Sequence, residues 1–283
     1  MKEKFVYVNS KKKQIQTEKK YIDVAIIDSG IDESHFHFKG TNLTVYDYCS
    51  TGSIDRLGHG TMIASQLTGE SDYLSGVYKY VNIIMYKVID INLTNSYWRF
   101  EKALLQAISD KVDIINMSIG FYLYLNKHEK TFEKLKGIFE MGTSKGIIFI
   151  SSAGYENSSG NSNQVHVPSV FESVISVASV SQLGTKMKSF EKADYYLQGG
   201  SWTFENAEFS YKDLCFVCCP LFNYSSHQLL ARGITFTAGH SIATAKLSGL
   251  VCCLLGESIK KLTLSDIKNK LDIIETDRCI ICV

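Results

Sequence analysis

The chain has 283 residues, of which 45% are apolar and 21% are charged, and its 30 basic and 29 acidic side chains leave a net charge of +1. This length suffices for one large domain with a buried core, and the even charge balance favours neither nucleic acid nor an anionic membrane as a partner. No apolar run is long enough to cross a bilayer, and the lysine-rich N-terminus lacks the apolar stretch of a secretory signal, so a cytoplasmic protein is expected.

Residues 1–20 are polar and without periodicity, and we expect them to form a surface arm ahead of one domain over residues 21–283. Beyond the arm, unbroken apolar runs alternate with segments whose apolar residues recur at helical spacing. The runs predict strands at residues 22–27, 81–89, 112–117, 147–151 and 174–180. The helical spacing predicts helices at residues 99–111, 131–145, 241–255 and 264–273. Residues 182–236 show no clear period, and loops with one or two antiparallel strands are expected there.

The alternation of strands and helices predicts an α/β fold, a mostly parallel central sheet with helices on both faces. Strands that are buried on both sides are apolar throughout, which agrees with these runs. In such sheets the functional residues follow the carboxyl ends of the strands. Polar residues stand directly after the predicted strands or at their ends: Asp28, Asn116, Ser118 and Ser151.

Three short motifs contain side chains of catalytic type. Asp28 ends the run VAIID, so its carboxylate can be held rigidly at a strand end. His59 lies between two glycines in GHGT, where the backbone can crowd around the imidazole. Ser241 begins an apolar helix, so its hydroxyl would lie near the positive end of the helix dipole. Each motif alone has an ordinary explanation as a turn, a loop or a helix N-cap.

Together the three motifs predict a catalytic triad. Ser241 would attack a carbonyl carbon, His59 would take and return its proton, and Asp28 would orient the imidazole and stabilise its charged form. The order Asp, His, Ser along the chain is that of subtilisin. In these three blocks the sequence resembles the subtilisin-like (subtilase, peptidase S8) family of serine proteases, and the resemblance covers about residues 22–181 and 235–256.

The resemblance implies the family's single α/β domain and locates its substrate-binding backbone. The segment INMSIG is similar to the strand that pairs with the substrate peptide and walls the first specificity pocket, whose base is expected around residues 157–165. The segment SSAG is similar to the opposite side of the cleft. The residues implied to bind substrate are Asn116, Ser118, Ile119, Gly120, Ser152, Ala153 and Gly154.

The sequence departs from the family pattern near the nucleophile. In the family an Asn follows Ala-Gly and donates to the oxyanion, but Tyr155 stands there, so either its phenol or Asn157 would have to supply the donor. His240 replaces a usual Thr, and Ala-Lys replaces a usual Pro-His five residues further on. The family's calcium-binding Asp is His37 here, so no strong calcium site is expected at that position.

The eight cysteines include two adjacent pairs, and without an export signal they are expected to remain thiols. Cys252 and Cys253 lie in an apolar stretch, where packing explains them. Two further pairs have the spacing with which thiolates bind zinc, an alternative that stays open: Cys215 with Cys218 and Cys279 with Cys282. The leading prediction is a protein without metal or cofactor.

The leading functional hypothesis is a serine endopeptidase inside the cell that hydrolyses peptide bonds through an acyl-enzyme intermediate. A narrower hypothesis is that it trims the leader from a ribosomally made precursor, such as a lanthipeptide or a bacteriocin. The alternative, suggested by Tyr155, is a catalytically impaired protein of the same fold that binds peptides or serves as a scaffold. In each case the expected partner is a peptide or protein, and not nucleic acid.

Overall fold

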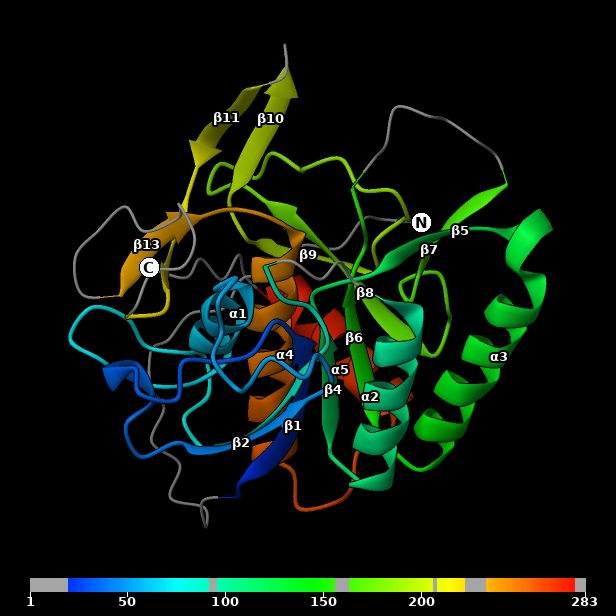
Figure 1. Ribbon diagram of the computed structural model, residues 1–283, viewed down its shortest axis with the longest axis horizontal. Coiled ribbons are helices and arrows are strands. Elements are labelled where there is room, and N and C mark those ends of the chain that lie inside the picture. Colours follow the sequence, from blue (N-terminus) through cyan, green and yellow to red (C-terminus); the bar gives the residue numbers. More distant parts are fainter. Residues whose placement is uncertain (1–19, 92–95, 156–162, 206–207, 222–232, 278–283) are drawn as a thin grey trace.

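A seven-stranded sheet forms the centre of the computed structural model, which describes residues 20–91, 96–155, 163–205, 208–221 and 233–277 (Figure 1). Every pairing of neighbouring strands in this sheet is parallel, which confirms the predicted α/β fold. In spatial order the strands are β2 (Asn42–Asp47), β3 (Val81–Lys87), β1 (Ile22–Asp28), β4 (Ile114–Met117), β6 (Ile148–Ser152), β8 (Val174–Val180) and β9 (Tyr195–Gln198).

Helices cover both faces of the sheet (Figure 1). One face carries α1 (His59–Leu67) and α4 (His240–Gly256), which pack against each other, and α5 (Leu264–Asp277) packs on α4. The other face carries α2 (Tyr97–Ser109) and α3 (Leu125–Ser144). A short 3-10 helix, η1 (Phe36–Phe38), follows β1.

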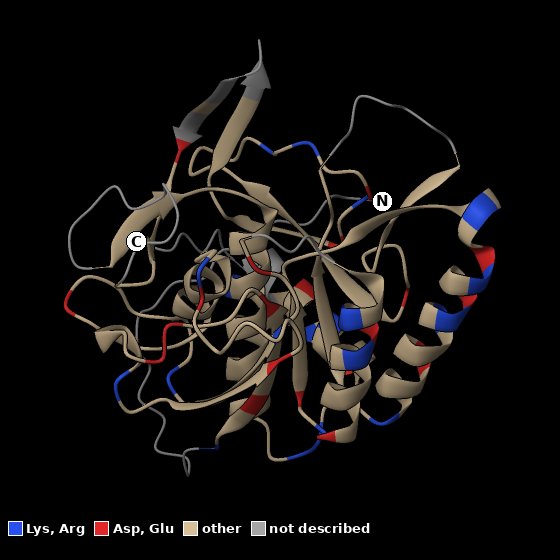
Figure 2. Cartoon of the chain, viewed as in Figure 1, with Lys and Arg blue, Asp and Glu red and all other residues tan. Residues whose placement is uncertain are grey.

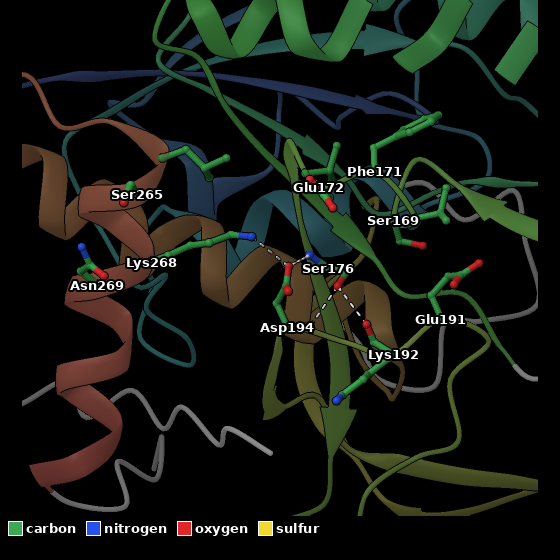
Figure 3. A pocket seen from close by; sticks show the side chains of 13 residues that line it. Ser169, Phe171, Glu172, Ser176, Glu191, Lys192, Asp194, Ser265, Lys268 and Asn269 are labelled. Atoms are coloured by element: carbon green, nitrogen blue, oxygen red, sulfur yellow. Dashed lines mark hydrogen bonds and ion pairs between the residues drawn. The ribbon is translucent and has the colours of Figure 1, made fainter. Parts of the chain in front are cut away.

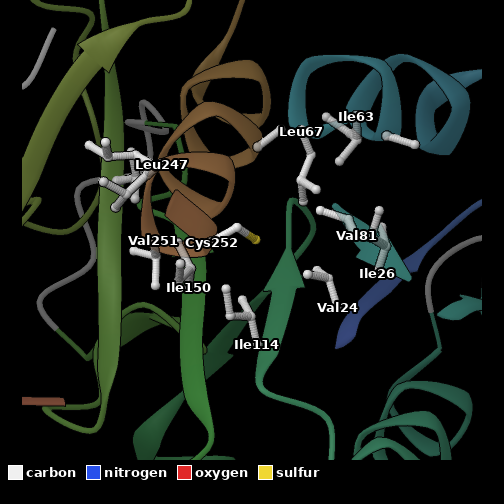
Figure 4. Close-up of a cluster of buried hydrophobic side chains, with 14 of the residues drawn as sticks. Val24, Ile26, Ile63, Leu67, Val81, Ile114, Ile150, Leu247, Val251 and Cys252 are labelled. Carbon is white, nitrogen blue, oxygen red and sulfur yellow. The ribbon is translucent and has the colours of Figure 1, made fainter. Parts of the chain in front are cut away.

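The side chains of β1 alternate between two cores because successive residues of a strand point to opposite faces. Val24 and Ile26 are fully buried in the cluster that α1 and α4 cover (Figure 4). Ala25 and Ile27 are fully buried in the cluster under α2 and α3. Full burial of a Val or Ile side chain stabilises a fold by about 1.5–3 kcal/mol, so β1 is fixed from both sides.

Three antiparallel pairs surround the central sheet. They are β5 (Phe121–Tyr124) with β7 (Gln164–Val167), β10 (Ser201–Glu205) with β11 (Glu208–Asp213), and β12 (Cys215–Cys218) with β13 (Ile234–Thr237). The sequence predicted one or two strands in residues 182–236, but β9 to β13 all begin there. They are four to six residues long, and such short strands carry too few positions for a period to show.

The strand order reverses next to β1, which has β3 on one side and β4 on the other. At such a reversal the connections leave the sheet in opposite directions, and a crevice opens beyond the carboxyl ends of the strands. Asp28 is the last residue of β1, and Ser118 directly follows β4. The fold therefore brings both segments to the carboxyl end of the sheet, where such crevices form.

The charges visible in Figure 2 are mixed, with acidic and basic residues interspersed along α2 and α3. Among the described residues, no helix combines the length and the apolar character that crossing a membrane requires. Residues 1–19, which make up nearly all of the expected surface arm, lie outside the described part of the chain.

Candidate active site

Asp28 and His59 form a hydrogen-bonded pair in which the carboxylate is buried and the imidazole is partly exposed. The Nδ1–H group of His59 donates to Asp28 Oδ1 at 2.8 Å and lies 3.0 Å from Oδ2. Asp28 is fully buried, and its Oδ1 also accepts from the backbone N–H of Ser29 at 2.7 Å. Burial lowers the pKa of His59, but the charge and hydrogen bond of Asp28 outweigh it and the pKa is raised above its ordinary value. This bond fixes the tautomer in which Nε2 of His59 is free to act as a base.

Asp55 holds the His59 turn against the end of β1, and the sequence analysis did not single it out. Its Oδ1 accepts from Ser29 Oγ and from the backbone N–H of Gly58, both at 2.8 Å. Its Oδ2 accepts from the backbone N–H and the hydroxyl of Thr61, at 2.9 and 2.6 Å. Burial raises the pKa of Asp55, and these four donors counteract the rise. A carboxylate four residues before His59 was the signal that could have revealed it.

The first turn of α1 also approaches the β1 loop very closely. Gly60 donates its backbone N–H to Ser29 Oγ at 2.8 Å. A Cβ atom at this position would collide with the carbonyl oxygen of Gly30. The second glycine of the GHGT motif is therefore required by close packing, which seats His59 beside Asp28.

Ser241 lies in the first turn of α4, where backbone N–H groups have no partner within the helix. Its hydroxyl donates to the carbonyl oxygen of Ser118 at 2.9 Å, and Ser118 Oγ donates to the carbonyl oxygen of Ser241 at 3.0 Å. Asn116 Nδ2 donates to Ser118 Oγ at 3.2 Å, and Ser248 Oγ donates to Asn116 Oδ1 at 2.9 Å. This buried network fixes the start of α4 against the end of β4.

Tyr155 reaches the same helix end with its phenol. The Tyr155 hydroxyl accepts from the backbone N–H of His240 at 3.2 Å, and its ring stacks on that imidazole with centroids 4.5 Å apart. The ring of Trp202 lies 4.9 Å from the ring of Tyr155. Tyr122 Oη donates to the carbonyl oxygen of Tyr155 at 2.8 Å and accepts from its N–H at 3.0 Å. A side chain at Gly239 would collide with the Tyr155 hydroxyl.

His240 anchors the start of α4 to the sheet. Its Nδ1 accepts from the backbone N–H of Ser179 at 2.8 Å, so Nε2 carries the proton and donates to the carbonyl oxygen of Lys188 at 3.1 Å. Burial lowers the pKa of His240 to about 4. The imidazole is therefore neutral at pH 7 and serves as a fixed link between α4 and β8.

The two backbone segments expected to bind substrate lie on either side of this helix end. Ser118 is buried and contacts Ser241, while Ile119 and Gly120 are partly exposed. On the other side, the carbonyl oxygens of Ala153 and Gly154 accept from the N–H groups of Glu191 and Phe190.

Two of the residues expected at the site are not seen to face a substrate. Asn116 is fully buried, with its amide engaged in the network described above, so its side chain positions Ser118 and has no surface for a substrate. Asn157, the alternative oxyanion donor, lies outside the described residues. Ser152 is buried at the end of β6.

No group of three or more His, Cys, Asp or Glu side chains within the described ranges could hold a metal ion. Cys215 and Cys218 occupy the first and last positions of β12, where alternation sends side chains three apart to opposite faces. Such a pair cannot grip one ion as two thiolates in a turn do, and Cys279 and Cys282 lie outside the described part. At the calcium position, the ring of buried His37 bonds to the carbonyl oxygen of Thr68 and to Ser71 Oγ, both at 3.1 Å.

A hollow of about 810 Å³ lies beside α5, at the end of the sheet where the parallel strands begin (Figure 3). It is bounded by α5 and by the segments that lead into β8 and β9, and Lys268 Nζ lies 3.5 Å from Asp194 Oδ2 within it. These are the amino ends of parallel strands, whereas functional residues in such sheets gather at the carboxyl ends. Asp28, His59 and Ser241 do not line this hollow.

Among protein-family models, the subtilase family matches residues 19–272. The nisin leader peptide-processing serine protease NisP of Lactococcus lactis subsp. lactis is 28% identical over 222 residues, or 64% of this chain and 32% of that protein. Subtilisin amylosacchariticus of Bacillus subtilis subsp. amylosacchariticus is 30% identical over 175 residues, or 61% of this chain and 44% of the relative. The chain thus spans less than half the length of these curated relatives.

The structural similarity covers a larger share of this chain than the sequence similarity does. A crystal structure described as a lanthipeptide protease matches 88% of this chain and 79% of its own, with a TM-score of 0.75 and 22% identity. At 22% identity the match shows a likeness of fold alone. This likeness agrees with the parallel sheet and with the packing of α1 against α4 described above. Because the family match covers nearly all of the described residues, the chain belongs to the subtilase family.

Proposed function

We propose that the protein is a serine endopeptidase in which Asp28, His59 and Ser241 form the catalytic triad. The observation that carries this proposal is the pairing of His59 with buried Asp28 at the end of the sheet where Ser241 lies in the first turn of α4. Neighbouring strands β1 and β4 and the packing of α1 on α4 bring the two parts together. Nucleophile, base and orienting carboxylate then each have a residue in a suitable setting.

In the reaction, His59 Nε2 takes the Ser241 proton as Oγ attacks the substrate carbonyl carbon, and it later gives that proton to the leaving amine. Asp28 stabilises the imidazolium that forms meanwhile. A hydroxyl has one proton, so Ser241 must turn from the Ser118 carbonyl oxygen toward His59 before it attacks. Such bonds often align only once substrate is bound.

The oxyanion would be stabilised at the amino end of α4. The Ser241 backbone N–H supplies one donor, and the Tyr155 hydroxyl, which already reaches the neighbouring His240 N–H, is the second candidate. Tyr155→Phe should lower kcat about tenfold to a hundredfold with little change in KM, because the lost bond forms mainly in the transition state. The comparison to make is steady-state kinetics of this variant and of Asn157→Ala. A parallel rise in KM with kcat preserved would assign Tyr155 to substrate binding instead.

The proposed substrate is a precursor peptide from which a leader is removed. Support comes from the relatives named as leader-processing proteases, which include NisP and the epidermin protease EpiP of Staphylococcus epidermidis. We further propose that the enzyme works in a reducing compartment inside the cell, because the cysteines in the described part are all free thiols.

A serine-directed fluorophosphonate tests the proposal directly. Ser241 should be labelled, as located by mass spectrometry of the digested protein, and Ser241→Ala should abolish both labelling and peptide cleavage. Ser144→Ala removes an exposed hydroxyl at the end of α3 and leaves the network around Ser241 intact, so it is the matched control and should still be labelled. A protein that binds peptides but is not labelled would support the second candidate, a silent peptide-binding module. The observation that favours this candidate is that the Ser241 hydroxyl donates its proton to the Ser118 carbonyl oxygen and not to His59.

A further inference from the structure

The imidazole of His166 fills a slot between two glycine backbones. A methyl group at Gly120 would come within 2.5 Å of His166 Cε1, and one at Gly154 would come within 2.6 Å of His166 Cγ. These distances are far below van der Waals contact, so the ring occupies the space toward which both glycines would direct a side chain. The ring is 4% exposed and stands on β7, which pairs with β5 directly after Gly120.

The slot lies beside the proposed nucleophile. One of its walls continues back from Gly120 to Ser118, whose carbonyl oxygen accepts the Ser241 hydroxyl at 2.9 Å. Its other wall continues from Gly154 to Tyr155, whose hydroxyl bonds to the N–H of His240. A peptide with its carbonyl carbon at Ser241 Oγ therefore has the adjacent side chain between these two walls. This side chain belongs to P1, the residue that contributes the carbonyl of the scissile bond.

His166 is held in place from several directions. Its Nδ1 hydrogen-bonds to Ser169 Oγ at 2.8 Å, and its backbone N–H donates to Glu191 Oε1 at 2.9 Å. The ring of Tyr122 covers it at a centroid distance of 5.0 Å. Burial, with a smaller contribution from His240, lowers the pKa of His166 to about 4, so the ring is uncharged at neutral pH. An uncharged ring with these contacts is a fixed filling and not a mobile surface group.

We propose that His166 is a specificity-determining residue, which fills the P1 slot between Gly120 and Gly154 and restricts cleavage to small P1 residues, namely Gly, Ala and Ser. The inference rests on the proposed function, because it places the scissile carbonyl at Ser241. A side chain as large as Leu or Phe would need the volume that the imidazole holds. Removal of the ring should therefore admit large P1 residues without impairing small ones.

Two readouts test this inference. The first is the rate at which Ser241 is labelled by peptidyl diphenyl phosphonates that differ only in an Ala-like or a Phe-like P1 group. The wild-type protein should react at least about a hundredfold faster with the Ala-like probe, and His166→Gly or His166→Ala should reduce or reverse this preference. The second is the affinity of peptides ending in Ala or Phe for Ser241→Ala protein, where His166→Gly should strengthen binding of the Phe peptide about tenfold or more. His37→Asn, at a buried histidine remote from the slot, is the matched control and should change neither preference.

The outcomes separate the two proposals. An affinity switch without labelling of Ser241 would support the slot and refute the endopeptidase. Labelling that is as fast with the Phe-like probe as with the Ala-like probe in the wild-type protein would overturn the slot and leave the endopeptidase standing. The wild-type comparison needs no substitution, so it decides the matter even if the His166 variants fail to fold. Absence of both labelling and peptide binding would refute both.

Discussion

Three buried histidines should make the protein sensitive to mild acid. Burial lowers the pKa values of His37, His166 and His240 from 6.5 to about 4. Between about pH 6.5 and pH 4 these groups are protonated in the unfolded chain and neutral in the folded one. The unfolded state then binds more protons, so the free energy of unfolding falls as the pH is lowered through this window.

The size of the effect follows from the pKa values. Between pH 7.5 and pH 5.5, a group with a pKa of 6.5 unfolded and about 4 folded contributes a loss of about 1.3 kcal/mol, so three such groups contribute about 4 kcal/mol. This is a large part of the 5–15 kcal/mol that stabilises a typical domain. The pKa of His35 is also lowered by burial and adds to this loss, whereas the raised pKa of His59 acts in the opposite direction and reduces it.

Single variants isolate one histidine from this sum. Urea unfolding of Ser241→Ala protein, which prevents self-digestion, should be measured at pH 7.5 and pH 5.5 with and without His37→Asn. His37→Asn should lower stability at pH 7.5, because it disturbs the bonds to Thr68 and Ser71, yet it should shrink the difference between the two pH values by about 1.3 kcal/mol. His128→Asn, at an exposed position on α3, controls for the loss of a surface histidine. An unchanged difference in His37→Asn, or a wild-type stability that does not fall at pH 5.5, would refute the reasoning.

Three further predictions concern Asp55 and the binding of calcium and zinc. Asp55→Asn should destabilise the fold by about 1–3 kcal/mol and lower kcat, because an amide cannot accept all four of the hydrogen bonds that hold the His59 turn. Urea denaturation measures the first effect and steady-state kinetics the second, and a loss of stability with kcat unchanged would show that Asp55 acts in folding alone. Micromolar calcium should leave the thermal midpoint unchanged if His37 replaces a calcium ligand, so a steep rise in a calorimetric titration would contradict this assignment. The purified protein should carry no stoichiometric zinc by elemental analysis and should fold equally well in reductant, whereas zinc lost on Cys215→Ser would revive the metal hypothesis.

The central sheet was predictable because its strands carry their own signal. Residues 174–180 form β8 as expected, and the run at residues 22–27 forms β1 with Asp28 as its last residue. These strands are buried on both faces, so the apolar run alone identifies them. The edge strand β2 escaped notice because it alternates partly buried and exposed residues. Strand β9 (YYLQ) lacks the run of β-branched residues that marks the equally short β4.

The three motifs that contain Asp28, His59 and Ser241 stand out for a different reason, since glycines within them meet a steric requirement of the fold. The collision that a Cβ at Gly60 would cause, for example, explains the second glycine of GHGT. Asp55 bonds mainly to nearby Gly58 and Thr61, so its position four residues before His59 was a usable local signal. His166 acts through Gly120 and Gly154, which lie farther away along the chain, and a single His gives no signal of such contacts. The base of the specificity pocket was expected around residues 157–165. The residue that fills the slot between Gly120 and Gly154 is His166, one position beyond that range. The structure was needed wherever a residue works through distant neighbours.

The departures around Ser241 form one unit and not a set of separate losses. Tyr155 supplies the acceptor for the His240 N–H and stacks on its ring, while His240 supplies the acceptor for the Ser179 N–H. An Asn at position 155 would remove the stack, and a Thr at position 240 would leave the Ser179 N–H without its partner, at a cost of about 1–3 kcal/mol. Residues in one such network do not change independently. Either family residue alone would therefore disturb the start of α4, so the second oxyanion donor is best sought in the phenol that this chain has placed there.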